Sequence, residues 1–305
     1  MNVALIIDYI GGDWKSFYCK DGNFFKVSDN TPFYRHDGVR NVFGMVRPFN
    51  GWCIDWSQGL PDVSFDVIFV AIETTGREVS TLRQKYPKAL MVSYLKEIVP
   101  ARNGLPEKTL KLMRDCDRIS SIFIKKETIA YMENIIQKKV YPMPCPYDME
   151  AIRAKHLSRA KSNTLFCGAP SDVPGRGYDE SLAFCKDMAK KYGYDVIEKL
   201  NFKDYSWDDW LKILGNCKAC VNMDKNQLLG QVPSECSILE VLHLGGVSDG
   251  AQLLWSKTAI NDPIILEGIL QSNYDSIVSE AYQKALEIHS FEAARKNLEN
   301  IMKGN

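Results

Sequence analysis

The sequence predicts an α/β fold made of two Rossmann-like, doubly wound domains. Residues 3–7 and 66–72 are continuous apolar runs, which are typical of strands buried on both faces of a parallel sheet. Stretches with helical spacing separate such runs, and this alternation indicates βαβ crossovers. The chain has 305 residues, and at roughly 100–200 residues per domain this length favours two domains.

The first half of the chain carries four apolar runs that we expect to be strands and two intervening stretches that we expect to be helices. The expected strands are 3–7, 66–72, 89–93 and 120–124, and the expected helices are 77–86 and 108–114. Residues 11–60 are rich in Gly, Asn, Asp and aromatic side chains. Such a composition favours loops and a hairpin over long helices.

Three prolines within five residues, at positions 142, 144 and 146, mark the expected domain boundary. Proline cannot continue a helix and biases the preceding residue toward extended backbone. The strand-and-helix pattern then restarts, so we assign 1–142 to one domain and 143–288 to the other. In the second domain, the expected strands are 163–168, 194–197 and 219–223, the expected helices are 180–192, 207–215, 237–244 and 274–302, and 229–235 is an expected loop.

The overall charge is balanced, with 38 basic and 38 acidic side chains. A zero net charge disfavours a protein that coats nucleic acid. No apolar run approaches the roughly 18 residues of a membrane span, and the N-terminus becomes acidic too early for a signal peptide. Nine cysteines without regular spacing indicate free thiols in a reducing compartment. We expect a cytoplasmic protein, or one of the host cytoplasm if the chain is viral.

Several common chemical motifs are absent from the sequence. There is no Walker pattern, GxGxxG, HExxH or GxSxG motif, which disfavours several large classes of hydrolase and metalloenzyme. Cys217 and Cys220 form a CxxC pair, but no second pair or HxxxH completes a zinc site. We therefore interpret these cysteines as structural thiols and expect no metal requirement.

The segment 219–246 has the order of a phosphate-binding unit: a strand, a glycine-containing loop and a helix. Backbone N–H groups at a helix N-terminus bind phosphate. In the predicted helix, Ser234 and Ser237 could cap the first turn and donate to phosphate oxygens. Glu240, one turn further into the helix, could accept hydrogen bonds from the ribose hydroxyl groups. Ordinary capping with a solvated glutamate is the alternative interpretation.

Three stretches, in this order, resemble the donor-binding domain of GT-B glycosyltransferases, of the retaining type that uses nucleotide sugars. Residues 140–150 resemble the "IPNGVD" linker of that family, 165–176 resemble its "VGR…KG" segment, and 233–246 resemble "P…LEAMACG". The resemblance implies two Rossmann-like domains that face a cleft, with the donor in 143–288. It also implies a C-terminal helix, about 289–305, that crosses back onto the first domain.

The same resemblance implies roles for individual residues. Arg176, Ser234, Glu235 and Ser237 would lie near the diphosphate of the donor, and Glu240 would bind the ribose. Two further residues, Phe202 and Tyr205, would lie near the nucleobase. The expected donor is a nucleotide sugar, a UDP-sugar being our first choice. Position 232 is valine where the family often has a first glutamate, and no lysine matches its second basic residue.

The first domain is expected to bind the acceptor. Asp8 and Glu73 follow predicted strands, where either carboxylate could deprotonate or orient a hydroxyl. Gly11 and Gly12 would offer backbone N–H groups at the same edge of the sheet, and we include them with the donor-binding residues. The alternative is that the two acids are loop caps and that the glycines only form a turn.

Charge is unevenly divided between the halves. Residues 1–142 hold 20 basic and 16 acidic side chains, whereas 143–305 hold 18 and 22. A basic acceptor half suits a polyanion. Aromatic residues alternate with basic ones around position 40, as in sites for a flipped or single-stranded base; the basic set is Arg35, His36, Arg40 and Arg47.

Our leading hypothesis is a glycosyltransferase that acts on DNA and resembles bacteriophage enzymes that modify hydroxymethylated pyrimidines. Two alternatives stay open. One is a glycosyltransferase for a glycan, lipid or small molecule. The other is a catalytically inactive GT-B-like binding protein, which the missing first glutamate would fit.

Overall fold

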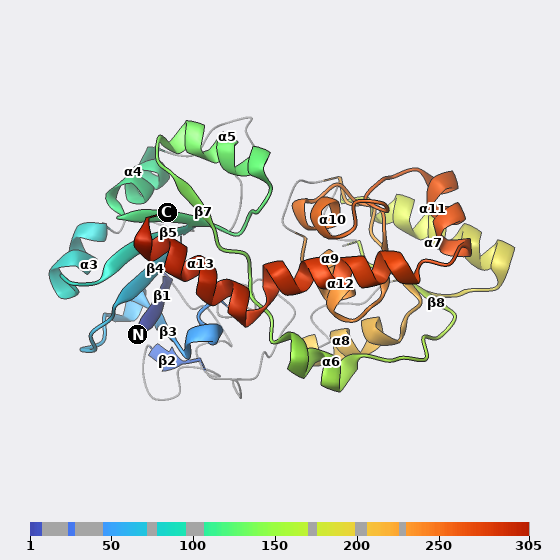
Figure 1. Cartoon of the computed structure of the whole chain (residues 1–305), viewed down its shortest axis with the longest axis horizontal. Helices are drawn as coiled ribbons and strands as arrows, with labels where there is room; N and C mark the ends of the chain where they lie inside the picture. The colour runs from blue at the N-terminus through green and yellow to red at the C-terminus, as the bar shows by residue number, and fades with distance from the viewer. Residues whose placement is uncertain are drawn as a thin grey trace. The chain divides into compact units, whose positions relative to one another are not determined.

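The computed structural model describes residues 1–7, 24–27, 45–71, 78–95, 107–169, 176–198, 206–225 and 230–304. They form two compact units, each built around its own sheet (Figure 1). The first unit contains the described residues up to Pro146 together with the C-terminal helix, and the second is Tyr147–Ser290. The sequence-based boundaries are 142 and 288, and the observed divisions follow Pro146 and Ser290.

The first sheet has seven strands in the order β2-β3-β1-β4-β5-β6-β7. Every neighbouring pair is parallel except β2 and β3, which are antiparallel. The strands are β1 (Val3–Ile7), β2 (Phe24–Lys26), β3 (Trp52–Asp55), β4 (Val67–Ala71), β5 (Leu90–Leu95), β6 (Arg118–Ser121) and β7 (Val140–Pro142). The prediction of a parallel, doubly wound sheet is confirmed, although β2, β3 and β7 were not among the expected strands.

The central strands of this sheet are buried on both faces, as their unbroken apolar runs predict. All five residues of β4 are buried, and its Phe69 pairs in register with Leu5 of β1. The helices that cover the sheet are α3 (Val79–Lys85), α4 (Glu107–Asp115) and α5 (Lys126–Ile136). Each buries an apolar stripe, for example Val79 and Leu82 of α3.

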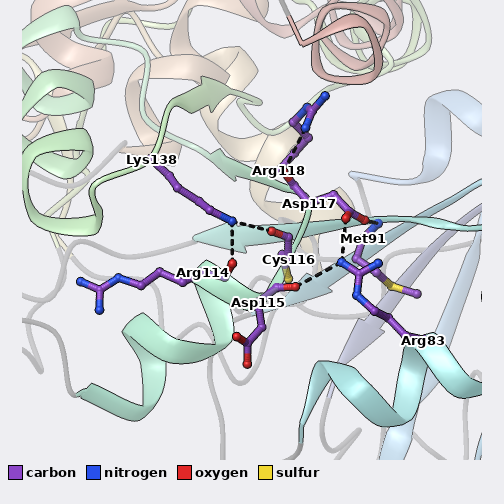
Figure 2. Close-up of polar contacts among 8 residues, drawn as sticks. All are labelled: Arg83, Met91, Arg114, Asp115, Cys116, Asp117, Arg118 and Lys138. Carbon is purple, nitrogen blue, oxygen red and sulfur yellow. Dashed lines mark hydrogen bonds and ion pairs between the residues drawn. The ribbon is translucent and has the colours of Figure 1, made fainter.

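A network of polar contacts ties α3 and α4 to the amino ends of β5 and β6 (Figure 2). Asp117 accepts a hydrogen bond from Arg83 at 2.7 Å and another from the backbone N–H of Met91 at 2.8 Å. Lys138 Nζ donates to the carbonyls of Arg114 and Cys116, at 2.5 and 2.9 Å. These two carbonyls lie at and just beyond the end of α4, so the lysine caps that helix.

The second sheet has four parallel strands in the order β11-β10-β8-β9. The strands are β8 (Thr164–Cys167), β9 (Asp195–Ile197), β10 (Ala219–Val221) and β11 (Leu242–Leu244). The helices of this unit are α6 (Met149–His156), α7 (Tyr178–Tyr192), α8 (Trp207–Asn216), α9 (Gln231–Ile238), α10 (Asp249–Leu254), α11 (Pro263–Gln271) and α12 (Asp275–His289). Its core includes the fully buried Phe166 and Trp210 rings, whose centroids are 4.9 Å apart.

One predicted element is wrong in both position and type. The sequence suggested a helix over 237–244 after a loop over 229–235, but α9 is Gln231–Ile238 and Leu242–Leu244 form β11. A short apolar run does not distinguish a buried strand from a helix. The helix also begins before Pro233, because the first turn of a helix tolerates proline.

The predicted helical stretch 274–302 is two helices that belong to different units. The chain breaks at Ser290, between α12 and α13 (Phe291–Lys303). Within the first unit, α13 lies against β7 (Figure 1). Arg295 Nε donates to the Pro48 carbonyl at 3.1 Å, and Arg118 Nε donates to the Ile301 carbonyl at 3.3 Å. The C-terminal helix therefore returns to the first unit, as the resemblance implied.

Two findings bear on the expectations drawn from composition. Within the described ranges, no helix is long and apolar enough to cross a membrane. Every cysteine in those ranges is buried and free of disulfide bonds, including Cys217 and Cys220. Burial raises the pKa of the Cys217 thiol to about 12, so this thiol is protonated at neutral pH.

Candidate functional site

The topology of the second sheet identifies one edge as the candidate ligand site. The strands run in chain order β8, β9, β10, β11, but β10 lies on the opposite side of β8 from β9. The direction of winding therefore reverses between β8 and β10. In open α/β sheets, ligands bind outside the carboxyl ends of the strands at such a switch point. The candidate site is thus formed by the residues that follow Cys167 and Val221.

Close backbone packing shapes this edge. Gly168 donates its N–H to the Val221 carbonyl at 2.8 Å, and a Cβ at Gly168 would lie 2.4 Å from the Cys220 Sγ atom. Gly177 has a φ of +72°, and a Cβ there would lie 2.1 Å from the Met223 carbonyl oxygen. Only glycine permits such an approach. The segments that follow β8 and β10 are consequently held together beyond the ends of their strands.

Arg176, which we predict to contact the diphosphate, lies at this edge. Its Nε atom is 2.5 Å from Oδ2 of Asp224, and the two side chains are 22% and 5% exposed. Asp224 was not among the predicted site residues. Its position three residues after the buried strand β10 was the available signal, because acids at that end of a parallel strand often face a ligand.

Asn222 carries a buried polar atom that no residue of the described ranges satisfies. The residue is 6% exposed, and its Oδ1 atom has no hydrogen-bond partner among the residues of the described ranges. Gly246, in the turn after β11, approaches so closely that a Cβ would lie 2.8 Å from the Asn222 carbonyl oxygen. An orphaned buried acceptor costs roughly 1–3 kcal/mol. A hydrogen bond from a bound ligand would remove this cost.

The N-terminus of α9 lies at the same edge, and no side chain within the described ranges caps it. Its N-cap is Gly230, with a φ of +75°, and the first turn contains no acidic residue. A Cβ at Gly230 would lie 2.5 Å from Ser248 Oγ, so the start of α9 contacts the N-cap residue of α10. The first-turn N–H groups and the helix dipole together favour an anion here.

The expected capping role of Ser234 and Ser237 is wrong. Both residues are fully buried inside α9, because the helix begins earlier than the sequence suggested. Ser234 Oγ lies 3.1 Å from His289 Nε2, and Ser237 Oγ donates to the Ser234 carbonyl at 2.6 Å. These hydroxyls connect α9 to α12 and to itself rather than to the carboxyl edge of the sheet.

Glu235 is fully buried and is bound by two indoles. Its Oε1 accepts from Trp207 Nε1 at 2.9 Å, and its Oε2 accepts from Trp210 Nε1 at 2.7 Å. The carboxylate therefore joins α9 to α8, and the predicted contact with the diphosphate is not supported. The signal for this role was the i, i+3 spacing of the two tryptophans, which places them on one face of α8.

Glu240 lies at the opposite edge of the sheet from Arg176, so its predicted place in the donor site is corrected. It follows the end of α9 and precedes β11, with a φ of +51°. That left-handed conformation is typical of the glycine that ends a helix. Glu240 thus lies in the turn that ends α9, away from the residues that follow Cys167 and Val221. Its Oε1 accepts from Arg153 Nη2 at 2.6 Å.

The first sheet has its own switch point, between β1 and β4. These strands are parallel neighbours that end at Ile7 and Ala71, so the chain leaves them at one edge of the sheet. Asp8 follows β1 directly in the sequence, and Glu73 follows β4 by two positions. The remaining predicted residues outside the described ranges, together with those two acids, are Gly11, Gly12, Arg35, His36, Arg40, Phe202 and Tyr205.

Arg47 is described. It begins the short 3-10 helix η1 (Arg47–Phe49), which packs against α13. The Pro48 carbonyl accepts the hydrogen bond from Arg295 noted above, so this basic residue sits on a structured part of the first unit. It is partly buried rather than on an open loop.

Comparison with known proteins adds a fold assignment to this geometry. The sequence matches no protein-family model and no curated protein. Several solved structures are similar. One is an α-glucosyltransferase in complex with UDP and a 13-mer DNA that contains an HMU base; it is 11% identical, with a TM-score of 0.59 over 99% of both chains.

Two further structures also match along nearly the whole chain. The apo structure of OtsA is 9% identical, with a TM-score of 0.62 over 99% of both chains. Sucrose-phosphate synthase from Thermosynechococcus elongatus is 10% identical, with a TM-score of 0.57 over 100% of this chain and 98% of the other. At such identities, the likeness concerns the fold. Together with the two largely parallel sheets and the returning C-terminal helix, it establishes that this chain has the GT-B fold.

Proposed function

We propose that the protein is a glycosyltransferase whose second unit binds a nucleotide-sugar donor, a UDP-sugar, at the carboxyl edge of β8 and β10. The observation that carries this proposal is the buried Asn222 Oδ1 atom at the switch point, together with the N-terminus of α9; the described residues provide neither a partner for the atom nor a side-chain cap for the helix. Structures with this fold in complex with UDP or UDP-glucose support the choice of donor.

The diphosphate of the donor would bind at the N-terminus of α9. Backbone N–H groups there carry a partial positive charge without needing a metal. Arg176 would supply a full charge, exchanging its ion pair with Asp224 for one with the diphosphate. Asn222 Oδ1 would accept a hydrogen bond from a hydroxyl group of the donor, which would remove the cost of its burial.

The proposed reaction is transfer of the sugar to an acceptor hydroxyl bound by the first unit. The acceptor oxygen forms a bond to the anomeric carbon, and the bond from that carbon to the diphosphate oxygen breaks. The leaving diphosphate takes up negative charge, which Arg176 and the α9 N-terminus would stabilise. Asp8 or Glu73 would accept the hydroxyl proton or orient the hydroxyl.

A hydroxymethylated pyrimidine in DNA is our proposed acceptor, as in bacteriophage DNA modification. The first 142 residues carry four more basic than acidic side chains, since they hold 20 and 16. The basic set of Arg35, His36, Arg40 and Arg47 would contact DNA phosphates. A structure of this fold has been solved with UDP and DNA bound, which supports the proposal.

Binding of UDP, measured by calorimetry with EDTA present, tests the donor site. We expect Arg176→Ala to weaken UDP binding at least tenfold, because the loss of a charge-assisted contact to phosphate costs about 1.5–3 kcal/mol. Lys257→Ala is the matched control; it removes an exposed ion pair with Glu280 that lies elsewhere in the same unit. Equal affinity in the two variants would refute the site.

The acceptor is tested by transfer from labelled UDP-glucose and UDP-N-acetylglucosamine. We expect product on hydroxymethylated DNA and none on unmodified DNA of the same sequence. Transfer to a free sugar or glycan instead would show that the acceptor assignment is wrong while the donor site stands. UDP binding without transfer to any acceptor would identify an inactive binding protein.

A further inference from the structure

The second unit contains a pocket of about 490 Å³ that the proposed function does not use. Four basic side chains line it, from Arg153, Arg159, Lys161 and Lys218, together with the carboxylates of Glu240 and Asp275. The pocket lies within one unit, and its volume is in the range of small-molecule sites.

This pocket is at the edge of the sheet opposite the proposed donor site. Lys161 precedes β8, Lys218 comes directly before β10, and Glu240 precedes β11. Since these strands are parallel neighbours, their amino ends meet at one edge. The four residues of β8, at about 3.3 Å each, separate this edge from the carboxyl edge. A ligand here would not occupy the donor site.

The charges of the pocket leave an excess of two positive charges. Arg153 and Glu240 neutralise each other across 2.6 Å. That leaves Arg159, Lys161 and Lys218 against Asp275, so three positive charges face one negative charge. An excess of two matches the charge of a phosphate monoester near neutral pH, whose second pKa is about 6.

The basic groups are available to an anion to different degrees. Arg159 is exposed and makes no hydrogen bond or ion pair with any residue of the described ranges. Lys218 Nζ donates to the Tyr194 hydroxyl at 3.2 Å and lies over that ring. Lys161 Nζ donates to the carbonyls of Gly215 and Leu239, at 2.7 and 2.8 Å. One of its three ammonium protons therefore remains for a ligand.

Burial also favours an anion beside Lys161. It lowers the pKa of this amine from 10.5 to about 8, because the charged form is poorly solvated. A phosphate oxygen would replace part of the solvation that burial removes. The remaining lining includes hydroxyl groups of Ser158, Tyr274 and Ser279, which suit the hydroxyls of a sugar or polyol.

We propose that this amino-edge pocket binds a small phosphorylated polyol, such as a sugar monophosphate, as a second ligand site distinct from the donor site. Arg159, Lys161 and Lys218 bind the phosphate. Glu240 and Asp275, with the hydroxyl groups of the lining, bind the polyol body. The volume exceeds what inorganic phosphate needs, so the polyol contributes to affinity.

Calorimetric titration with ribose 5-phosphate tests the proposal, with ribose and inorganic phosphate as comparisons. We expect ribose 5-phosphate to bind more tightly than phosphate, and ribose not to bind. Saturating UDP leaves this affinity unchanged, because the two edges of the sheet are separate; competition by UDP would place the ligand in the donor site and overturn the proposal.

Two charge reversals complete the test. Arg159 is exposed and makes no polar contact with the described residues, so the Arg159→Glu variant is expected to fold, with at least a tenfold loss of affinity for ribose 5-phosphate. Lys190→Glu makes the same charge change on the exposed end of α7, outside the pocket, and changes affinity less than twofold. Equal effects of the two reversals would overturn the proposal. So would a wild-type protein that does not bind ribose 5-phosphate at about 10 mM.

Discussion

The two edges of the second sheet satisfy their polar groups in opposite ways, and α9 connects them. At the amino edge, three carbonyls at the ends of α8 and α9 accept from cations: Gly215 and Leu239 from Lys161, and Ile238 from Arg153. At the carboxyl edge, α9 begins without a side-chain cap, and Asn222 Oδ1 has no partner in the described part of the chain.

This difference separates what the fold needs from what a ligand needs. Cations at helix C-termini stabilise the fold through the helix dipole and through hydrogen bonds to the last carbonyls. The first unit uses the same device, since Lys138 caps α4 (Figure 2). Arg159 and Lys218 are not needed for this purpose, because neither side chain bonds a helix-terminal carbonyl in the described part of the chain. These two residues are therefore the ones that indicate a ligand at the amino edge.

The largest change in stability is expected from a substitution of Glu235, which binds α9 to α8. Glu235→Gln keeps one oxygen for one tryptophan but turns an N–H group toward the indole N–H of the other. Since the site is fully buried, we expect a loss of about 3 kcal/mol of unfolding free energy, measured by urea denaturation.

Glu198→Gln is the control for this variant. It removes a carboxylate that is 52% exposed and pairs with Lys186 at the surface, and we expect no measurable change in stability. A similar midpoint for both variants would mean that Glu235 does not hold α9 in place, and that the two edges are not linked through it.

The second effect tests the amino edge alone. Lys161→Met removes the group that bonds the Gly215 and Leu239 carbonyls, and we expect a loss of about 2 kcal/mol at pH 7. The pKa of Lys161 is about 8 when folded and 10.5 as its ordinary value, so between these values the unfolded state binds more protons. Wild-type stability contributed by this group therefore rises with pH in that window.

The cost of Lys161→Met should accordingly be larger at pH 10 than at pH 7, because the methionine lacks this titration. Urea denaturation of both proteins at the two pH values gives the comparison, and other titrating groups cancel in the difference. A cost that is equal at both pH values would show that Lys161 is not desolvated in the folded protein.

The sequence predicts the layout of this molecule better than its site. Continuous apolar runs such as 66–72 mark buried parallel strands without reference to distant residues, and β4 matches that run. The first and last residues of α9 could not be predicted in this way. The run 238–244 suits a helix or a strand, and only the pairing of β11 with β10 decides between them.

That error determined the errors in the site. Because α9 begins at Gln231, Ser234 and Ser237 lie inside it, and Glu240 lies past its end. The prediction for Arg176 did not depend on the bounds of α9. Its placement at the carboxyl edge follows from its position after β8. Asp224 and Asn222 were missed because their importance comes from burial at a switch point, which requires knowledge of the strand order.

The smallest effect has the opposite sign and tests the carboxyl edge. Asn222→Leu replaces a buried acceptor that has no partner among the described residues with an apolar side chain of similar size, so we expect a gain of about 1 kcal/mol in unfolding free energy. The same change should weaken UDP-glucose binding, because the acceptor for a donor hydroxyl is lost.

Ser181→Ala is the control. The Ser181 hydroxyl accepts from the Met223 N–H at 2.9 Å, so its removal destabilises the protein. A gain in stability together with a loss of affinity is the signature of a polar group retained for a ligand. If Asn222→Leu destabilises the protein as Ser181→Ala does, then Asn222 belongs to the fold, and the contrast between the two edges does not hold.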